Sequence, residues 1–326
     1  MLSGISRILS QKASIFTILT AIVTFFMPDL FGWVQGVTQT IILGIIMLTM
    51  GLTLTPNDLK LLAQRPLDIF IGSLAQFTIM PLVAYTLTSV FSMIPAFAPY
   101  STAMTIGIIL VGCCPGGVSS NIMSFLCGGD VAYSVGMTCA STIMAPILTP
   151  LLVLLLAGEK VDVDAVSMFQ QILIVTIIPI AIGFILNMKL GHKPVFSKIQ
   201  SCMPGVSVIS LACIVGGVVY TVHDPLVENG MFLFIITFCM VFCHNTIGYL
   251  LGYTVGTIFN FNKAKKRTIS IEVGMQNAGL GTNLAMIFFV ANNPMSVVPC
   301  AISCAWHSIS GTILANIFSA YDNRKK

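Results

Sequence analysis

The residues CCPGGVSSN at positions 113–121 and EVGMQNAGLG at positions 272–281 each interrupt a long apolar segment of the chain. Pro115 has no backbone N–H and clashes with the preceding helical turn, so it bends or ends a helix. Glycines such as Gly116 and Gly274 make it easier for the backbone to leave helical geometry. The sequence therefore predicts two broken helices.

The rest of the chain is too apolar for a soluble protein. Of its 326 residues, 56% are hydrophobic and 8% are charged, whereas soluble domains carry roughly 25% charged residues. The net charge of +4 comes from 15 basic and 11 acidic residues, which are too few and too scattered to bind nucleic-acid phosphates. This composition excludes a soluble enzyme, a disordered scaffold and a nucleic-acid-binding protein, and it predicts a helical protein of the lipid bilayer.

Ten apolar segments follow one another along the chain, close to the length of about 20 residues that a helix needs to cross a bilayer. They cover residues 13–31, 37–54, 67–92, 102–126, 131–157, 168–188, 204–221, 231–258, 269–290 and 297–318. Arg7 and Lys12 before the first segment are also typical of a signal peptide, but no small-residue cleavage pattern follows. We expect an all-α polytopic membrane protein with ten transmembrane helices.

The charges predict the orientation of these spans, because cytoplasmic loops of membrane proteins are enriched in Lys and Arg. With ten spans and cytoplasmic termini, the following basic residues lie inside: Arg7, Lys12, Lys60, Arg65, Lys189, Lys193, Lys198, Lys263, Lys265, Lys266, Arg267, Arg324, Lys325 and Lys326. Lys160 alone lies outside, with the acids Asp29, Glu159, Asp162, Asp164, Asp224 and Glu228. The run 263–267 could instead be a nuclear signal or an anionic-lipid site, but between two spans it is most simply an orientation anchor.

The chain divides into two halves of five spans, residues 1–165 and 166–326. Because five is odd, the second half is inserted upside down relative to the first, and such inverted repeats are typical of secondary transporters. Each half has its break in its fourth span. Glycine and proline also occur in membrane helices simply for packing, but two breaks at corresponding positions favour a binding site, because half-helix ends attract ions.

Glu272 is the one acidic residue well inside an apolar segment. A charged side chain at the bilayer centre costs about 2.5–3.5 kcal/mol on insertion scales, and no Lys or Arg lies at comparable depth to offset it. The sequence therefore predicts a bound cation or a proton as its partner. The alternative is a neutral glutamate that is hydrogen-bonded for structural reasons.

Oxygen-bearing side chains accompany Glu272 in the neighbouring segments: Gln76, Ser120, Asn121, Ser134, Thr138 and Gln276. Ser134 and Thr138 have i,i+4 spacing and share a helix face. Carboxylate, hydroxyl and amide oxygens suit hard cations, and a single carboxylate favours a monovalent ion such as Na⁺.

Histidines and cysteines within the spans are expected to be structural. His244 and His307 could relay protons, but we favour neutral rings that are hydrogen-bonded between helices. The ten cysteines lie mostly in apolar runs, where free cysteine packs as a small hydrophobic side chain. A metal site with either histidine would lack any recognised ligand spacing.

The two broken segments resemble the bile acid:sodium symporter family, and the similarity is greatest to its bacterial ten-helix members. GLTL at 51–54, AQF at 75–77 and WHSISG at 306–311 extend the resemblance over essentially the whole chain. The resemblance implies a panel domain of spans 1, 2, 6 and 7 and a core domain of spans 3–5 and 8–10. The broken spans 4 and 9 would cross near mid-membrane.

The resemblance also implies two sodium sites beside this crossing. The first would use Ser120, Asn121, Ser134, Thr138 and Glu272, and the second would use Gln76, Glu272, Gln276 and the backbone carbonyls of Val273 and Met275. Asn277 would face the substrate. Many relatives carry a Thr where this chain has Val118, so one hydroxyl toward an anionic group is missing, and Ser119 is the candidate to replace it.

The sequence thus predicts a symporter that couples inward movement of two Na⁺ ions to import of an organic anion by alternating access. The substrate would be bile acid-like or a small carboxylate such as pantoate. We expect a monomer in the bacterial inner (plasma) membrane, with no nucleic-acid partner and no cofactor besides Na⁺. The alternatives are a proton-coupled or efflux transporter on the same scaffold, and a channel. An enzyme would need a nucleophile–base pair or a metal constellation, and the sequence offers neither.

Overall fold

The computed structural model describes residues 4, 6, 8, 9, 12–117, 119–159 and 161–323. Arg7, Val118, Lys160 and residues 324–326, which carry predictions from the sequence, lie outside the described residues. Within the described part, every named secondary-structure element is a helix.

The principal helices follow the apolar segments of the sequence closely. They are α2 (Ala13–Phe26), α3 (Gly36–Thr53), α4 (Pro56–Gln64), α5 (Pro66–Phe91), α6 (Ser101–Cys113), α7 (Ser119–Leu126), α8 (Val131–Ala157), α9 (Ala165–Ile172), α10 (Ile178–Leu190), α11 (Pro194–Ile258), α12 (Lys263–Gly274), α13 (Ala278–Phe288) and α14 (Val297–Asn323). A short π-helical stretch, Leu173–Ile177, joins α9 to α10, so these two helices form one continuous segment.

Seven helical segments among the described residues are long and apolar enough to cross a membrane. They are Gly36–Thr53, Pro66–Phe91, Val131–Ala157, Ala165–Leu190, Pro194–Asp224, Phe232–Ile258 and Pro294–Asp322. The other three predicted spans coincide with shorter apolar helices, Ile15–Phe26, Phe97–Cys113 and Ala278–Phe288. The protein is therefore an all-helical polytopic membrane protein.

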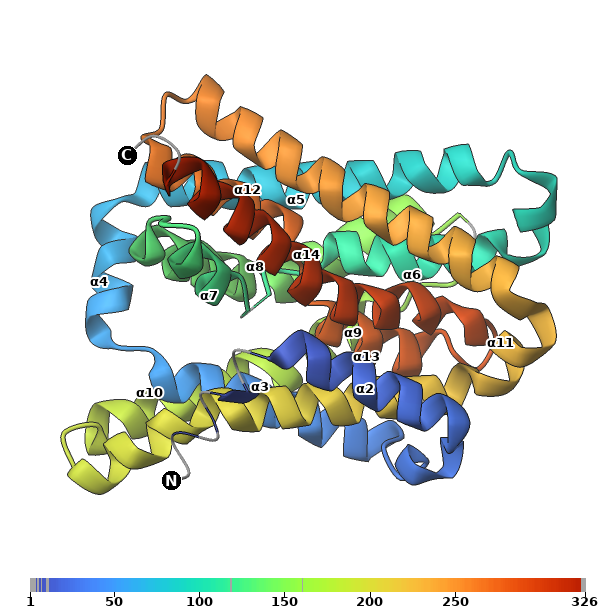
Figure 1. The fold of residues 1–326 in the computed structure, drawn as a ribbon, viewed down its shortest axis with the longest axis horizontal. Coiled ribbons are helices and arrows are strands. Elements are labelled where there is room, and N and C mark those ends of the chain that lie inside the picture. Colours follow the sequence, from blue (N-terminus) through green and yellow to red (C-terminus); the bar gives the residue numbers. More distant parts are fainter. Residues whose placement is uncertain are drawn as a thin grey trace.

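Two features of the helices differ from the pattern of the sequence. The predicted spans 204–221 and 231–258 belong to α11, whose helical hydrogen bonding continues while the chain turns back on itself between them (Figure 1). The helix α4 was not predicted, because its nine residues are too few and too polar to cross a bilayer. It lies at one end of the molecule, between α3 and α5 (Figure 1).

The helices form two groups that lie side by side, and most helices in each group run along the long axis of the molecule (Figure 1). In the first group, α2, α3 and α10 pack with the first half of α11. In the second group, α5, α6, α8, α12, α13 and α14 contact one another. The start of α12, the α10–α11 connection and α4 lie at one end, and the α5–α6 connection and the turn of α11 lie at the other (Figure 1).

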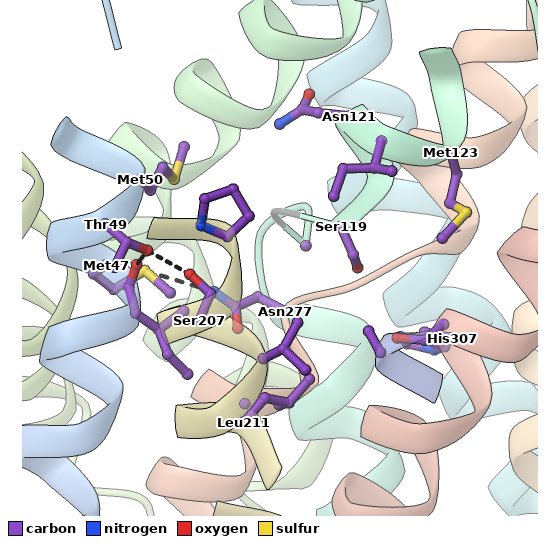
Figure 2. A pocket seen from close by; sticks show the side chains of 18 of the residues that line it. Met47, Thr49, Met50, Ser119, Asn121, Met123, Ser207, Leu211, Asn277 and His307 are labelled. Carbon is purple, nitrogen blue, oxygen red and sulfur yellow. Dashed lines mark hydrogen bonds between the residues drawn. The ribbon is translucent and has the colours of Figure 1, made fainter. Parts of the chain in front are cut away.

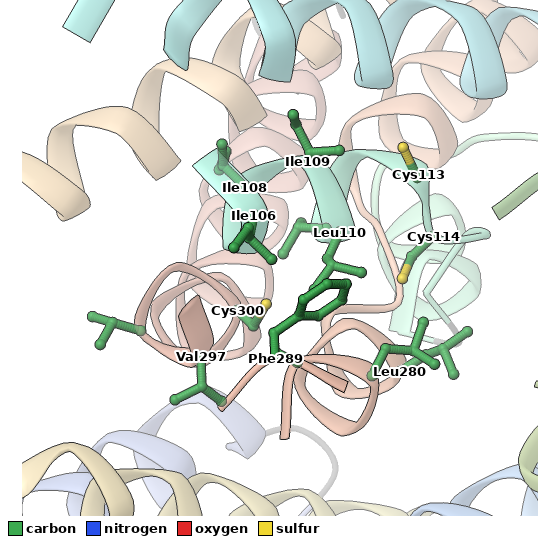
Figure 3. Close-up of a cluster of buried hydrophobic side chains, with 14 of the residues drawn as sticks. Ile106, Ile108, Ile109, Leu110, Cys113, Cys114, Leu280, Phe289, Val297 and Cys300 are labelled. Carbon is green, nitrogen blue, oxygen red and sulfur yellow. The ribbon is translucent and has the colours of Figure 1, made fainter. Parts of the chain in front are cut away.

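The helix α6 is buried on all sides, since α5, α8, α13 and α14 all contact it. Ile106, Ile109 and Leu110 are completely buried, and Figure 3 shows Ile106 and Leu110 on the side of the helix that faces Phe289 and Cys300. A helix that is apolar all round is typical of a position inside a larger helical assembly. The first broken helix is thus held at the centre of the second group.

The contact between α3 and α10 depends on two glycines that face each other. A Cβ atom on Gly183 of α10 would lie 2.6 Å from the carbonyl oxygen of Leu48 and 2.7 Å from the backbone nitrogen of Leu52. A Cβ atom on Gly51 of α3 would meet the carbonyl of Ile180 in turn. Small residues let helix backbones approach closely in membranes, and here both partners must be glycine.

We expect Gly183→Ala to destabilise the protein by about 1–3 kcal/mol, because the added methyl group overpacks the contact with α3. The matched control is Gly44→Ala on α3, where the nearest atom to the new Cβ, Cγ of Pro179, is 3.8 Å away. Thermal unfolding in detergent compares the two variants with the wild type. Equal unfolding temperatures for the two variants would contradict the close contact.

Candidate functional site

The two broken helices meet at their breaks. The first break separates α6 from α7, and the second separates α12 from α13. Gly116 and Gln276 form an antiparallel bridge between them. The backbone N–H of Gly117 donates to the carbonyl of Met275 (2.9 Å), and that of Asn277 donates to the carbonyl of Pro115 (2.8 Å). Four half-helix ends therefore lie around one crossing point.

The crossing needs glycine in the first break, because the second break lies directly against it. A Cβ atom on Gly117 would be 2.9 Å from the carbonyl oxygen of Gln276. A Cβ atom on Gly116 would be 3.1 Å from Oε2 of Glu272 and 3.5 Å from Nε2 of Gln76. Gln76 and the Glu272 carboxylate thus both lie against Gly116.

Glu272 is completely buried in the last turn of α12. Its carboxylate accepts hydrogen bonds from the hydroxyl groups of Ser120 (2.5 Å), Thr138 (2.9 Å) and Ser134. These hydroxyls come from α7 and α8, in the other half of the chain. None of the ion pairs among the described residues involves Glu272. The carboxylate is thus surrounded by neutral oxygens and has no basic partner there.

All five residues predicted for the first ion site lie together. Oδ1 of Asn121 accepts a hydrogen bond from Ser134 (2.9 Å) and lies 3.4 Å from the Thr138 hydroxyl. Ser124, which was not predicted, joins this cluster through a 3.1 Å hydrogen bond with Ser134. Its i,i+4 spacing from Ser120 places it on the same face of α7, so the spacing alone would have identified it.

The residues predicted for the second ion site also lie together. Nε2 of Gln76 donates to Oε1 of Gln276 (3.1 Å), and Nε2 of Gln276 donates to the carbonyl of Val273 (2.7 Å). The carbonyl of Met275 faces Gly117 across the crossing. Oε1 of Gln76 is buried and has no hydrogen-bond partner among the described residues.

The chemistry of these groups fits a hard monovalent cation. The three groups that bond the Glu272 carboxylate are hydroxyls, and hydroxyl and carboxylate oxygens suit ions such as Na⁺ rather than soft metals. A buried oxygen without a partner is unfavourable by about 1–3 kcal/mol, and Oε1 of Gln76 is such an atom. A cation bound there would satisfy it.

Two polar side chains, those of Asn245 and His307, hold the second break from outside, and His244 bonds α5 instead. Nδ2 of Asn245 donates to the carbonyl of Gly274 (2.7 Å) at the end of α12. The ring of His307 contacts the carbonyl of Gln276 through Nδ1 (3.2 Å), and that of His244 contacts the carbonyl of Met80 through Nε2 (3.0 Å). The predicted hydrogen bonding of both histidines between helices is confirmed. Asn245 was not predicted, because its partner lies on a different helix.

A cavity of about 470 Å³ lies beside the crossing, between the two groups of helices (Figure 2). Ser119 and Asn277, two of the residues predicted to face the substrate, line it, and Val118, the third, lies outside the described residues. Across the cavity, Thr49 of α3 and Ser207 of α11 form a 2.5 Å hydrogen bond (Figure 2). The volume is within the range of roughly 300–1,000 Å³ that is typical of small-molecule sites.

A small apolar cluster lies at one side of the cavity. Val215, Ala278 and Cys304 form this cluster, with Ala21, Leu211 and Val219 packed against it. In the other direction the lining extends to Leu54 and Asp58, near α4. The cavity therefore extends from the crossing toward the end of the molecule that carries α4.

Membrane-crossing helices with two breaks that cross beside an ion site and a ligand-sized cavity are typical of secondary transporters. Residues 40–229 match the model of the Sodium Bile acid symporter family. Because this match covers more than half of the chain, the protein belongs to that family.

Three relatives agree with this assignment. The chain is 41% identical over 323 residues to the sodium-dependent transporter YocS of Bacillus subtilis. The aligned residues cover 99% of this chain and 95% of YocS. It is 38% identical over 291 residues to the probable sodium/metabolite cotransporter BASS1 of Arabidopsis thaliana (89% and 69% covered). It is 30% identical over 260 residues to the ileal sodium/bile acid cotransporter of Oryctolagus cuniculus (78% and 71%). The protein therefore belongs to a family of sodium-dependent transporters and is a transporter, not an enzyme.

We expect Thr138→Val to lower the free energy of unfolding by about 1–3 kcal/mol, because Glu272 loses a buried hydrogen-bond donor. Thr142→Val is the matched control. Both threonines bond the carbonyl four residues before them on α8, but only Thr138 reaches Glu272. Chemical unfolding in detergent at neutral pH measures the difference, and equal losses would show that the bond to Glu272 contributes nothing.

Proposed function

We propose that the protein is a sodium-coupled symporter that imports an organic anion by alternating access. The observation that carries this proposal is the buried Glu272 carboxylate, which lies at the crossing among neutral oxygen donors. Sodium dependence is a property of the family, and the two residue sets around Glu272 support two Na⁺ sites. The first set is Ser120, Asn121, Ser134, Thr138 and Glu272, and the second is Gln76, Glu272, Val273, Met275 and Gln276.

The proposed scaffold is a pair of inverted five-span repeats, residues 1–165 and 166–326, with ten spans in all. The group formed by α2, α3, α10 and the first half of α11 would be the panel domain, and α5–α8 and α12–α14 with the second half of α11 would be the core domain. The placement of the cavity between these groups supports this division. Movement of the core against the panel would expose the cavity to one side of the membrane at a time.

Hydrogen bonds on the side of the crossing away from α4 support an inward-open arrangement. Nδ2 of Asn283 on α13 donates to the hydroxyl of Thr40 on α3 (3.1 Å), and Nε2 of Gln171 on α9 donates to Oδ1 of Asn283 (3.1 Å). Together with the cluster of Val215, Ala278 and Cys304, these bonds join core to panel on the closed side.

The basic residues support cytoplasmic termini and a location in the bacterial plasma membrane. The segments that carry Lys60, Lys193, Lys198 and Lys263 lie at the end of the molecule toward which the cavity extends (Figure 1). By the positive-inside rule this end faces the cytoplasm. Both groups of helices and the cavity belong to one chain, which supports transport by a monomer.

The cavity lining supports an anionic substrate with an apolar body. The amide of Asn277, the hydroxyl of Ser119 and the first turns of α7 and α13 present hydrogen-bond donors and positive helix ends, which attract a carboxylate or sulfonate. Leu43, Met47 and other apolar residues line the opposite wall. A bile acid-like molecule and a small carboxylate such as pantoate both have this chemistry.

Sodium would act on transport through Glu272. Na⁺ bound at both sites neutralises the carboxylate and joins α7, α8 and α12 to the crossing, which orders the helix ends that meet the substrate. Two Na⁺ ions with one monovalent anion carry a net positive charge inward. A membrane potential then contributes about 2.3 kcal/mol per charge per 100 mV to import.

We expect Glu272→Gln to abolish Na⁺-dependent uptake, because the amide keeps the size of the side chain but loses the charge that both ions share. Uptake of a labelled organic anion into proteoliposomes under an inward sodium gradient measures this. Glu159→Gln, at an exposed position between α8 and α9, is the control and should transport as the wild type does. Equal uptake by the wild type in potassium buffer would refute sodium coupling.

The second candidate is a proton-coupled or efflux transporter of an organic or inorganic anion, with Glu272 as the proton carrier. The three hydroxyl donors around Glu272 are compatible with this role, because they stabilise the carboxylate after it has released its proton. The amide oxygens of Gln76 and Asn121 favour sodium, because a proton carrier does not need them.

Thermal stability in different salts separates the two candidates. If Na⁺ binds the folded protein, NaCl raises the unfolding temperature, and a Na⁺ concentration of 100 times Kd contributes about 2.7 kcal/mol per site. KCl and choline chloride at the same ionic strength should have no such effect, and Glu272→Gln should lose the response to NaCl. Equal stabilisation by all three salts would favour the proton carrier.

A further inference from the structure

A second hollow, separate from the substrate cavity, lies between α2, α11 and α14. We call it the α2–α14 crevice. Its volume is about 550 Å³, and all of its lining side chains are hydrocarbon except the indole of Trp306. Ala21 of α2 and Ala301 and Ala305 of α14 are among these residues, and their small side chains leave room between the helices.

The crevice is continuous with the surface that faces lipid. Ile22 and Phe26 of α2 and Phe234 of α11 line it, and all three are exposed at the surface of the protein. In a membrane-spanning protein, exposed apolar side chains of this kind face hydrocarbon, because lipid-exposed surfaces carry no unsatisfied polar groups. The lipid phase therefore has direct access to the crevice.

Water has no binding partner inside the crevice. The ring of Trp306 packs against Phe238 and Phe242, with ring centroids 5.1 and 5.5 Å apart. Its Nε1 atom is buried and has no hydrogen-bond partner among the described residues. A buried water needs two to four polar partners, and apolar cavities stay dry. The crevice therefore suits an apolar occupant and not water.

We propose that the α2–α14 crevice binds an acyl chain of a membrane phospholipid. The chain lies along α2 between α11 and α14, with its methylene groups against Ala21, Ala301 and Ala305. A transported organic anion fits this crevice poorly, because its carboxylate would meet no donor other than the single indole N–H. The occupant is thus a lipid that stays in the membrane, not the transported substrate.

The lipid site and the substrate cavity are separated by the apolar cluster described above. Leu211, Ala278 and Cys304 of the cluster line the substrate cavity, whereas Ala21, Val215 and Val219 line the crevice. Both hollows therefore touch one thin layer of side chains from opposite sides. The binding of the acyl chain does not depend on which ion or substrate the protein transports.

Tryptophan fluorescence tests the proposal directly, because the chain has two tryptophans. Trp33 lies on an exposed position outside the crevice, so Trp33→Phe leaves Trp306 as the sole reporter. The full-length variant is reconstituted into bilayers of phospholipid that carries bromine in the middle of its acyl chains. Bromine quenches tryptophan on contact, and we expect loss of most of the Trp306 emission relative to unbrominated lipid.

A matched pair of substitutions assigns the quenching to the crevice. Ala305→Leu fills the crevice next to Trp306 and should restore most of the emission in brominated lipid. Ala320→Leu makes the same change at an exposed position of α14 outside the crevice and should leave the quenching unchanged. Ala301→Leu repeats the test at a second lining residue, should Ala305→Leu fail to fold.

Four results would overturn the proposal. Undiminished emission in brominated lipid would show that no acyl chain enters the crevice, and quenching by aqueous iodide instead would show that water fills it. Equal quenching in Ala305→Leu and Ala320→Leu would show that bromine reaches the indole from elsewhere. Quenching that develops only when the protein is diluted in lipid would show that a second copy of the chain covers the crevice.

Discussion

The hydrogen bonds between Glu272 and three hydroxyls of the other half of the chain are the interaction on which the rest of the structure depends. A carboxylate buried in a membrane is tolerated only where other groups stabilise it. Ser120, Ser134 and Thr138 do so, and this requires α7, α8 and α12 to meet at one point. The breaks, the glycines within them and the buried surroundings of α6 all serve that meeting.

The pairing of the two breaks explains why the protein has two of them. Each break leaves backbone groups without helical partners, and membrane proteins must satisfy most such groups within the protein. The N–H of Gly117 bonds the carbonyl of Met275, and the N–H of Asn277 bonds the carbonyl of Pro115. Each break thus supplies the partners that the other requires, so neither would be stable alone.

Much of this arrangement could be predicted from the sequence, because apolar segments mark the helices that cross the membrane. The helix positions and both breaks were predicted from hydropathy and from proline and glycine, whereas the residues around Glu272 were predicted from their oxygen-bearing side chains and from the family resemblance. Which helix face meets which neighbour is set by packing, so Asn245 and the bonds of Asn283 to Thr40 and Gln171 were missed. The basic run 263–267 was interpreted only as an orientation anchor, whereas Lys265 pairs with Asp68, and Arg267 pairs with Asp322.

The buried Arg267 gives α12 a second role. Its guanidinium bonds the carbonyls of Cys127 and Phe318 as well as Asp322, so this residue is fixed at the edge of the helical bundle. Glu272 follows five residues later on the same helix, which at 1.5 Å per residue is about 7.5 Å along its axis. The length of one short helical stretch therefore sets how deep the carboxylate lies. A change in the length of this stretch would therefore move the carboxylate away from the hydroxyls of α7 and α8 that bond it.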